Sequence, residues 1–276
     1  MDWTVFCEEM SVCLYQCGQV ARRLRGKVAR EDKEPEEHQL STGISDVDRM
    51  CQEIILVKAL HVMPGLEVSG EEVEELPPDL TRLFSRNSGR HVLVIDPVDG
   101  SDCYLEGGTE YAHMVGILDQ ETGLTACGLV YFPESYRLYY AIRGSGSFVV
   151  DGLFGEPRRL EVVEPPRTCG QVKRLEDGDY AAFDRAGFSL DTTDNRSAAY
   201  AHIRVAEGSL GAMVARYFHG YDTAITSVII EEAGGQVLGD DGARVRYEKA
   251  MPRMPLVISS VWPEFAEELY RALRGS

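Results

Sequence analysis

Two carboxylates stand three residues apart in the segment VLVIDPVDGS, residues 92–101, and they offer the clearest chemistry of the chain. The aliphatic run before Asp96 is typical of a buried strand, and the proline that follows cannot continue the strand's hydrogen-bond ladder. We therefore expect Asp96 and Asp99 on a tight turn, beside the flexible backbone of Gly100 and the hydroxyl of Ser101. Acids, bare N–H groups and a hydroxyl at the carboxyl end of a strand can hold hard cations beside a phosphate.

Two further acidic groups stand at the ends of predicted elements. Glu71 and Glu72 follow a short strand and Gly70, and Asp222 opens a helix directly after Tyr221. Each acidic group also has a purely structural interpretation, as a solvated loop, a turn with side-chain capping, or an ordinary helix N-cap. Metal sites for phosphate chemistry need several carboxylates that converge from different segments. The three groups together therefore favour a metal site over three unrelated structural roles.

The elements that must position these acids are predicted from hydrophobic periodicity. Residues 26–44 are charged and aperiodic and are predicted as a mobile loop, and Asp46 is the expected cap of the helix that follows. Helices are expected at residues 2–25, 46–62, 222–233 and 263–274, and strands at 66–68, 92–96, 112–118, 124–132, 137–142, 147–150 and 212–214. Residues 164–200 show no clear pattern. This order predicts an N-terminal α+β half with a large, mostly antiparallel mixed sheet, residues 1–155, and a C-terminal α/β half, residues 156–276, which supplies Asp222.

Composition limits the classes of partner. The chain has 276 residues, 44% of them apolar, and a net charge of −17, which argues against non-specific nucleic-acid binding. No apolar run approaches the length of a membrane span. Seven cysteines without a CxxC pair suggest reduced thiols, and the acidic N-terminus is unlike a signal peptide, so we expect a cytoplasmic protein.

Several ordered motifs resemble those of the inositol monophosphatase superfamily, which includes 3'(2'),5'-bisphosphate nucleotidases and some fructose-1,6-bisphosphatases. Residues 95–101, IDPVDGS, resemble its DPxDGT/S motif. Glu71 and Glu72 after Gly70 resemble its GEE segment. The segments YDTA at 221–224 and EAGG at 232–235 resemble WDxAxG…EAGG, and RSAA at 196–199 resembles GSAA. The resemblance covers about residues 40–240, in the same order as in the superfamily.

The resemblance implies a set of metal ligands. A first ion would be held by Glu71, Asp96 and the Val98 carbonyl, and a second by Asp96, Asp99 and Asp222. Mg²⁺ suits such oxygen ligands. A third, weaker Mg²⁺ near Glu71 remains an open alternative.

The resemblance also implies the reaction, an in-line attack of a metal-activated water on a phosphomonoester. Ser101 would help Glu71 to position and deprotonate the water. The N–H groups of Gly100 and Ser101 would hold phosphate oxygens. Lithium would inhibit by replacing one Mg²⁺.

The substrate is less well indicated, because the chain departs from the superfamily pattern. Ala215 stands where inositol monophosphatases often place a glutamate that binds inositol hydroxyls. Its neighbour Arg216 could pair with a second phosphate or lie on the surface. His219, close to Asp222, could line the pocket or serve a surface or core role. With Gly100 and Ser101, the residues 215, 216 and 222 form the predicted substrate contacts.

Our leading hypothesis is a Mg²⁺-dependent phosphatase of a small phosphomonoester of the inositol monophosphate type. The alternatives are a nucleotidase acting on 3'-phosphoadenosine 5'-phosphate, a fructose-1,6-bisphosphatase, and a weakly catalytic regulator that binds a phosphorylated ligand. The fold implied by the resemblance is a layered α-β-α-β-α sandwich of the α+β class. A homodimer is expected, since most relatives form dimers.

Overall fold

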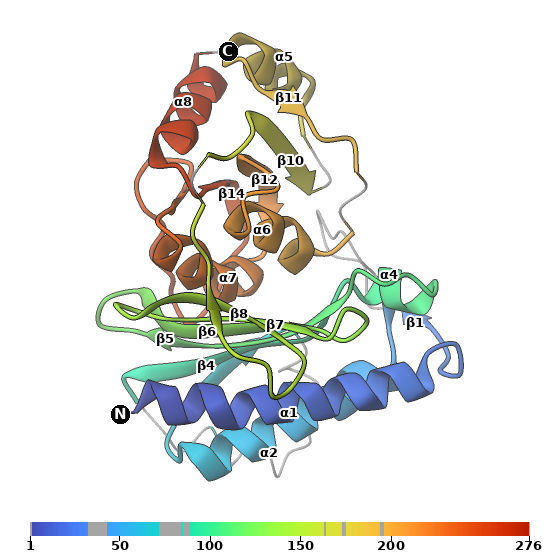
Figure 1. Cartoon of the computed structure of the whole chain (residues 1–276). Coiled ribbons are helices and arrows are strands. Elements are labelled where there is room, and N and C mark those ends of the chain that lie inside the picture. Colours follow the sequence, from blue (N-terminus) through green and yellow to red (C-terminus); the bar gives the residue numbers. More distant parts are fainter. Residues whose placement is uncertain are drawn as a thin grey trace.

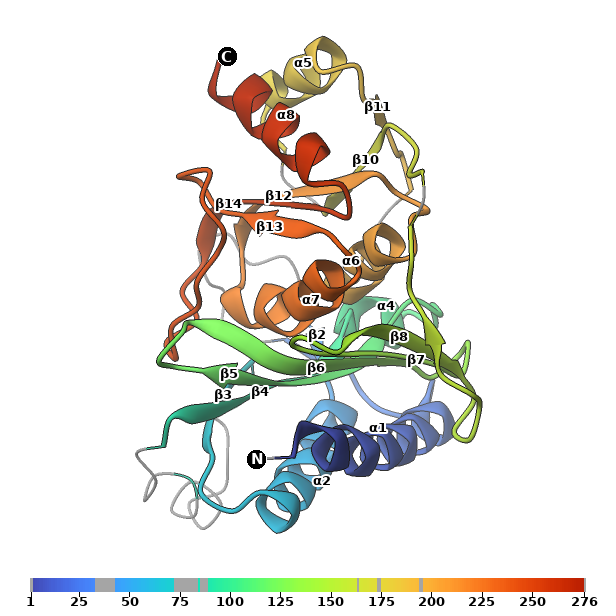
Figure 2. The ribbon, with the colours of Figure 1, turned by 60° about the vertical axis from the view of Figure 1, so that its left-hand side comes forward.

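Five layers build the chain, in the order helices, sheet, helices, sheet, helices (Figure 1). The same order is visible after rotation of the molecule (Figure 2). The structure is a computed structural model that describes residues 2–32, 43–71, 84, 89–162, 164–172, 175–193 and 196–275. The predicted mobile loop therefore lies largely outside the described residues, except for the ends that form the short strands β1, Glu31–Asp32, and β2, Gly43–Ile44.

The first layer consists of α1, Trp3–Leu24, and α2, Asp46–Val62, close to the predicted bounds. In α1, an apolar stripe with a spacing of three to four residues faces the core and includes Phe6, Met10 and Leu14. The N-cap of α2 is Ser45 rather than Asp46. This corrects the predicted cap: the Ser45 hydroxyl accepts a hydrogen bond from a backbone N–H of the first turn, whereas the side chain of Asp46 lies 71% exposed beside Arg49.

The second layer is a seven-stranded sheet in the order β3-β4-β5-β6-β7-β8-β9. Its strands are β3, Glu67–Gly70; β4, His91–Asp99; β5, Ala112–Asp119; β6, Leu124–Phe132; β7, Arg137–Ile142; β8, Gly146–Asp151; and β9, Arg158–Arg159. Only the β3–β4 pair is parallel, so the sheet is mostly antiparallel, as predicted. The two predicted hairpins are present. The last strand, β9, lies just beyond residue 155, at which we set the boundary between the halves.

Strand β4 does not stop at Asp96, as the proline suggested, but continues to Asp99 with a change of register. Asp96 pairs with Met114 and Asp99 pairs with Ala112, so two residues of β4 oppose one residue of β5. This is the arrangement of a β-bulge, which accommodates the missing N–H of Pro97 without ending the strand. The short helix α4, Ser101–Leu105, follows directly.

The third layer, α6, Ala198–Ala206, and α7, Gly220–Glu232, lies between the two sheets (Figures 1 and 2). Helix α7 is buried on nearly every side, which explains its apolar sequence. It begins two residues before Asp222, and its N-cap is His219. Asp222 therefore lies within the first turn instead of capping the helix.

The fourth layer is a five-stranded sheet in the order β11-β10-β12-β14-β13, and the fifth is formed by two helices. The strands are β10, Thr168–Val172; β11, Ser189–Leu190; β12, Ala212–Phe218; β13, Gln236–Leu238; and β14, Met254–Ser260, and the helices are α5, Asp177–Arg185, and α8, Pro263–Arg274. The strand expected at 212–214 thus extends to residue 218, and the aperiodic region 164–200 contains several short elements. All seven cysteines are free and buried. No helix in the described part of the chain is long and apolar enough to cross a membrane.

Candidate metal centre

Three buried carboxylates meet at the carboxyl end of β4. Asp96, Asp99 and Asp222 each place an oxygen within 4.8 Å of the other two. Their residues are 2%, 6% and 8% exposed. Within the described residues, no other group of three His, Cys, Asp or Glu side chains is gathered in this way. The structure therefore brings together three of the predicted ligands, from β4 and from α7.

Asp99 connects this centre to the start of α6. Its carboxylate accepts hydrogen bonds from the hydroxyl of Ser197, from the N–H of Ala198 at 3.0 Å and from the N–H of Ala199 at 2.9 Å. These donors belong to the RSAA motif. A carboxylate at this position satisfies N–H groups that a helix leaves unpaired at its first turn. Asp99 is thus fixed by two elements that are distant in sequence.

The backbone around the bulge completes the local geometry. The N–H of Val98 donates to Asp96 Oδ1 at 3.1 Å, and the Val98 carbonyl accepts from the Ser101 hydroxyl at 2.8 Å. Gly100 adopts a φ of 80°, in the left-handed region that favours glycine. A side chain there would also crowd the Glu110 carbonyl and Ser197 at 3.1 Å. Gly100 therefore allows the chain to turn sharply from β4 into α4.

Ser101 has a second partner that the sequence did not reveal. Its hydroxyl lies 2.9 Å from Asp48 Oδ1, and Asp48 is 1% exposed. The other Asp48 oxygen accepts from the N–H and hydroxyl of Ser45, at 2.9 and 2.8 Å. Ser45 and Asp48 form a capping box at the start of α2, a local pattern that was available in the sequence. The contact with Ser101, 53 residues away, was not.

Glu71 follows β3 at the same edge of the sheet. Strand β3 runs parallel to β4, and their pairing ends with Gly70 beside Ile95, so Glu71 and Asp96 are the next residues of the two segments at this edge. Burial is the main cause that raises the pKa of Asp48, Asp99 and Asp222, and the charge of Glu71 adds to the shift of each, so Glu71 lies in the same electrostatic environment. Glu72 lies outside the described residues.

The pKa values of two of the clustered carboxylates are raised, which shows that their charged forms are unfavourable at this buried position. Burial raises the pKa of Asp99 to about 6, although the hydrogen bonds from the start of α6 oppose the shift. Burial and the charges of Asp99 and Glu71 raise the pKa of Asp222 well above its usual range. Asp222 Oδ1 is buried and has no hydrogen-bond partner within the described chain. Several hard oxygen ligands with one unsatisfied oxygen fit a divalent cation such as Mg²⁺.

Two predicted substrate contacts lie elsewhere. Ala215 is fully buried in β12. Arg216 donates to both Asp179 oxygens, at 2.7 and 2.6 Å, and so ties β12 to α5. His219 stacks on Tyr221 with ring centroids 4.7 Å apart. The assignments of Ala215 and Arg216 to the substrate stay predictions, and their surroundings offer no support for them.

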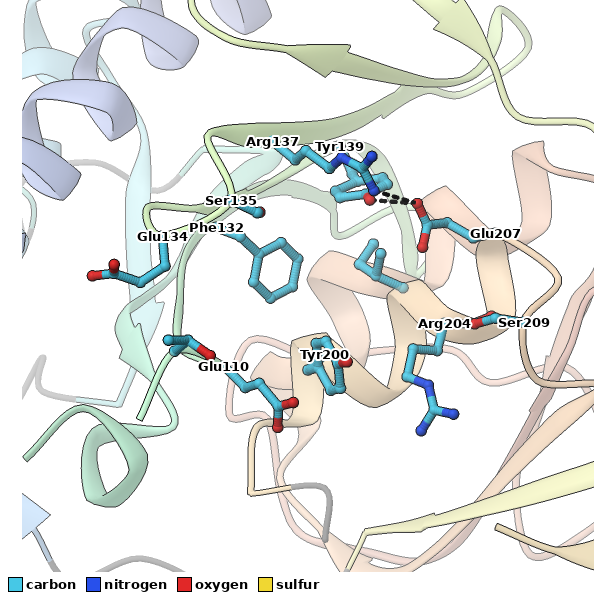
Figure 3. A pocket seen from close by; sticks show the side chains of 12 residues that line it. Glu110, Phe132, Glu134, Ser135, Arg137, Tyr139, Tyr200, Arg204, Glu207 and Ser209 are labelled. Carbon is cyan, nitrogen blue, oxygen red and sulfur yellow. Dashed lines mark hydrogen bonds and ion pairs between the residues drawn. The ribbon is translucent and has the colours of Figure 1, made fainter. Parts of the chain in front are cut away.

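A cavity of about 670 Å³ lies beside α6, near the carboxylates but not lined by them. Figure 3 shows the rings of Phe132 and Tyr200 in its centre, with Glu110 on one side and Glu207 on the other. Tyr200 directly follows the residue whose N–H binds Asp99, and the Glu110 carbonyl borders Gly100. The cavity and the carboxylate centre therefore share the start of α6.

Comparison with known proteins decides the family. The sequence matches the profile of the inositol monophosphatase family over residues 5–276. The chain belongs to the inositol monophosphatase family. Members of this family are phosphatases, which hydrolyse phosphoric monoesters, so the predicted enzyme class is confirmed.

Individual members of the family show what the chain is similar to. A histidinol-phosphatase of Streptomyces coelicolor is 28% identical over 217 residues, covering 73% of this chain and 75% of that protein. An inositol-1-monophosphatase of Mesorhizobium japonicum is 26% identical over 206 residues, covering 73% of each. The crystal structure of an IMPase/NADP phosphatase complexed with Mg²⁺ and phosphate has a TM-score of 0.75 at 18% identity, covering 99% of this chain and 97% of that one. The predicted layered α-β-α-β-α sandwich is thereby confirmed.

Proposed function

We propose that the chain is a Mg²⁺-dependent phosphatase that hydrolyses a small phosphomonoester. The observation that carries this proposal is the buried cluster of Asp96, Asp99 and Asp222, with an unpartnered oxygen on Asp222. Such a cluster is unfavourable unless a cation or protons neutralise it. A relative of the same fold is described as complexed with Mg²⁺ and phosphate, which supports the same ion here.

We assign the metal ligands as the family resemblance suggests. Glu71, Asp96 and the Val98 carbonyl would hold one Mg²⁺, and Asp96, Asp99 and Asp222 a second; a third near Glu71 stays open. When bound, the ions neutralise the carboxylates, attract the phosphate and make a nearby water more acidic. The N–H groups of Gly100 and Ser101 belong to the sharp turn after β4 and are proposed to hold phosphate oxygens.

Ser101 and Asp48 are proposed to accept the proton of the attacking water. The single proton of the Ser101 hydroxyl can be donated either to the Val98 carbonyl or to Asp48 Oδ1. When it is donated to Asp48, the hydroxyl oxygen keeps its lone pairs for a proton from water, and the pair can pass that proton to the carboxylate. Burial raises the pKa of Asp48, which makes it a better base. The hydrogen bond therefore favours Asp48 over Glu71 as the partner of Ser101, and Glu71 keeps its role as a metal ligand.

For the substrate we propose an alcohol phosphate, with the inositol monophosphate type as the first candidate. A second candidate is an amine-bearing phosphomonoester such as histidinol phosphate. Its organic part would lie in the cavity beside α6, where the aromatic rings of Phe132 and Tyr200 stand next to Glu110 and suit a cationic group. Glu207, at the far side, is already bound by Tyr139 and Arg137. The relative named histidinol-phosphatase supports this candidate. A nucleoside bisphosphate is less favoured, because the Arg216 guanidinium is already engaged by Asp179 through Nε and one Nη.

The test is phosphate release with Mg²⁺ from a panel of inositol 1-phosphate, histidinol phosphate, 3'-phosphoadenosine 5'-phosphate and fructose 1,6-bisphosphate. We expect turnover of one monoester, complete dependence on Mg²⁺, and loss to background in Asp96→Asn. Asp46→Asn is the matched control, because Asp46 is exposed and outside the cluster. Full activity of Asp96→Asn would refute the metal assignment. Binding of the substrates without release would favour the regulatory alternative.

Two further properties belong to this proposal. Lithium is expected to inhibit turnover, and Mg²⁺ added in excess should relieve the inhibition.

We also propose a homodimer, which sedimentation equilibrium would show as twice the mass of the 276-residue chain. A monomer at all concentrations would remove the second proposal without affecting the first.

A further inference from the structure

A fully buried histidine stands opposite the bulge that separates Asp96 from Asp99. His113 is the single residue of β5 that faces both Pro97 and Val98 of β4. Its side chain is 0% exposed, and its ring lies edge-on to Tyr111 with centroids 6.2 Å apart. A polar ring at such a position needs a hydrogen-bond partner or a function.

The partner is the backbone of the bulge itself. His113 Nδ1 lies 2.5 Å from the carbonyl oxygen of Pro97. A carbonyl can only accept, so Nδ1 carries the proton and donates it. The other ring nitrogen, Nε2, is buried without a partner among the described residues. The ring therefore makes one hydrogen bond, to the bulge, and leaves its second nitrogen unsatisfied.

The bulge places the carboxylates of Asp96 and Asp99 in the same cluster. In a regular strand, residues three apart point to opposite faces of the sheet. The extra residue in β4 reverses this alternation, and Asp96 and Asp99 come to the same cluster. A bulge also disrupts the local ladder, so its carbonyls lose regular backbone donors. The Nδ1–H of His113 supplies a donor at this point.

We propose that His113 is a positioning residue that holds the Asp96–Asp99 bulge in its metal-binding form through the hydrogen bond to Pro97. The inference rests on the proposed metal centre and adds a residue to it. His113 contacts neither substrate nor metal; it acts through Pro97 on the two carboxylates and on the Val98 carbonyl between them. Residues that orient metal ligands in this way commonly affect metal affinity by about 10- to 100-fold.

The test is a calorimetric titration of the full chain with Mg²⁺ alone, for the wild type and three variants of His113. In His113→Asn the amide nitrogen can take the place of Nδ1 and donate to Pro97. In His113→Gln the amide nitrogen lies farther out, near the place of Nε2, and in His113→Phe there is no donor. We expect wild-type affinity in the asparagine variant and about tenfold weaker binding in the other two.

A control separates this effect from general damage to the core. Phe188→Leu alters the apolar cluster between the five-stranded sheet and the outer helices, away from β4, and should leave Mg²⁺ affinity unchanged. Equal weakening in all three His113 variants, or unchanged affinity in His113→Phe, would overturn the proposal. Should His113→Phe not fold, the asparagine and glutamine variants decide the matter.

The outcome for His113 can be told apart from that for the proposed function. If the wild type binds Mg²⁺ but releases no phosphate from any substrate, the proposed function fails while the titration still judges His113. If the wild type releases phosphate and His113→Gln binds Mg²⁺ as tightly as His113→Asn, only the positioning role fails. A wild type that binds no Mg²⁺ overturns both.

Discussion

Mg²⁺ binding should weaken steeply below pH 6, because protons and the metal compete for the same buried oxygens. The pKa of Asp99 is about 6, and that of Asp222 is raised as well. A ligand carboxylate must be deprotonated before it can bind. The apparent dissociation constant then rises by the factor 1 + 10^(pKa − pH), which is about 1.1 at pH 7 and about 11 at pH 5 for Asp99 alone. Protonation of Asp222 adds to this loss.

The same pKa shift affects the metal-free protein in the opposite direction. The folded-state pKa of Asp99 lies above the value of about 3.9 in an unfolded chain, so its protonated form stabilises the fold at low pH. This contribution, about 3 kcal/mol, is fully present below about pH 4 and is lost as the pH rises through about 6. The increase in Tm on adding Mg²⁺ should therefore be larger at pH 7 than at pH 5.

Titration calorimetry with Mg²⁺ at pH 5, 6, 7 and 8 measures the affinity directly. Repeating each titration in two buffers of different ionisation enthalpy counts the protons released on binding. The exposed-site variant Asp46→Asn should give the same pH profile as the wild type. An affinity that stays constant from pH 7 to pH 5, or binding at pH 6 without proton release, would refute the reasoning.

Two other predictions concern hydrogen-bonded pairs. Ser101→Ala and Asp48→Asn should each lower kcat by about 100-fold with little change in KM. Because both residues lie on one proposed proton path, the double variant should be no slower than the slower single variant. Steady-state kinetics in which the two losses in kcat multiply would contradict a shared path. Arg216→Met should lower the free energy of unfolding by about 2 kcal/mol, because it leaves the buried carboxylate of Asp179 without its cation, and adding Asp179→Asn should recover part of that loss. Urea unfolding measures both variants, and unchanged stability of Arg216→Met would show that the pair contributes nothing.

The sequence predicted those parts of the fold that local patterns determine. The periodicity of α1, α2 and α8 and the alternation in the β5–β6 and β7–β8 hairpins gave element positions close to the observed ones. The elements of residues 164–200 could not be predicted from periodicity, since β10, α5 and β11 are too short for a hydrophobic pattern to repeat. Their positions depend on packing between distant segments, which local patterns do not contain.

In the candidate site, too, some contacts could be predicted from the sequence and others depend on packing between distant segments. The resemblance to the family motifs implied that Asp96, Asp99 and Asp222 would share one site, and the structure brings the three together. The contact of Asp48 with Ser101 was missed, since it links two segments without any shared motif. The bulge was missed for a different reason: a proline in a strand usually indicates an end, and only the pairing with β5 reveals that the strand continues.

The contact between Asp99 and the start of α6 has a consequence for the order of folding. Its three hydrogen bonds join residues 98 to 100 positions apart, and Asp222 arrives from still later in the chain. Contacts of such long range form only after the chain has lost the entropy of closing the loop between them. In refolding, helical circular dichroism should therefore recover before phosphate release does. A chain interrupted during synthesis ahead of α7 would contain Asp96 and Asp99 but lack Asp222, and so could not complete the proposed metal centre.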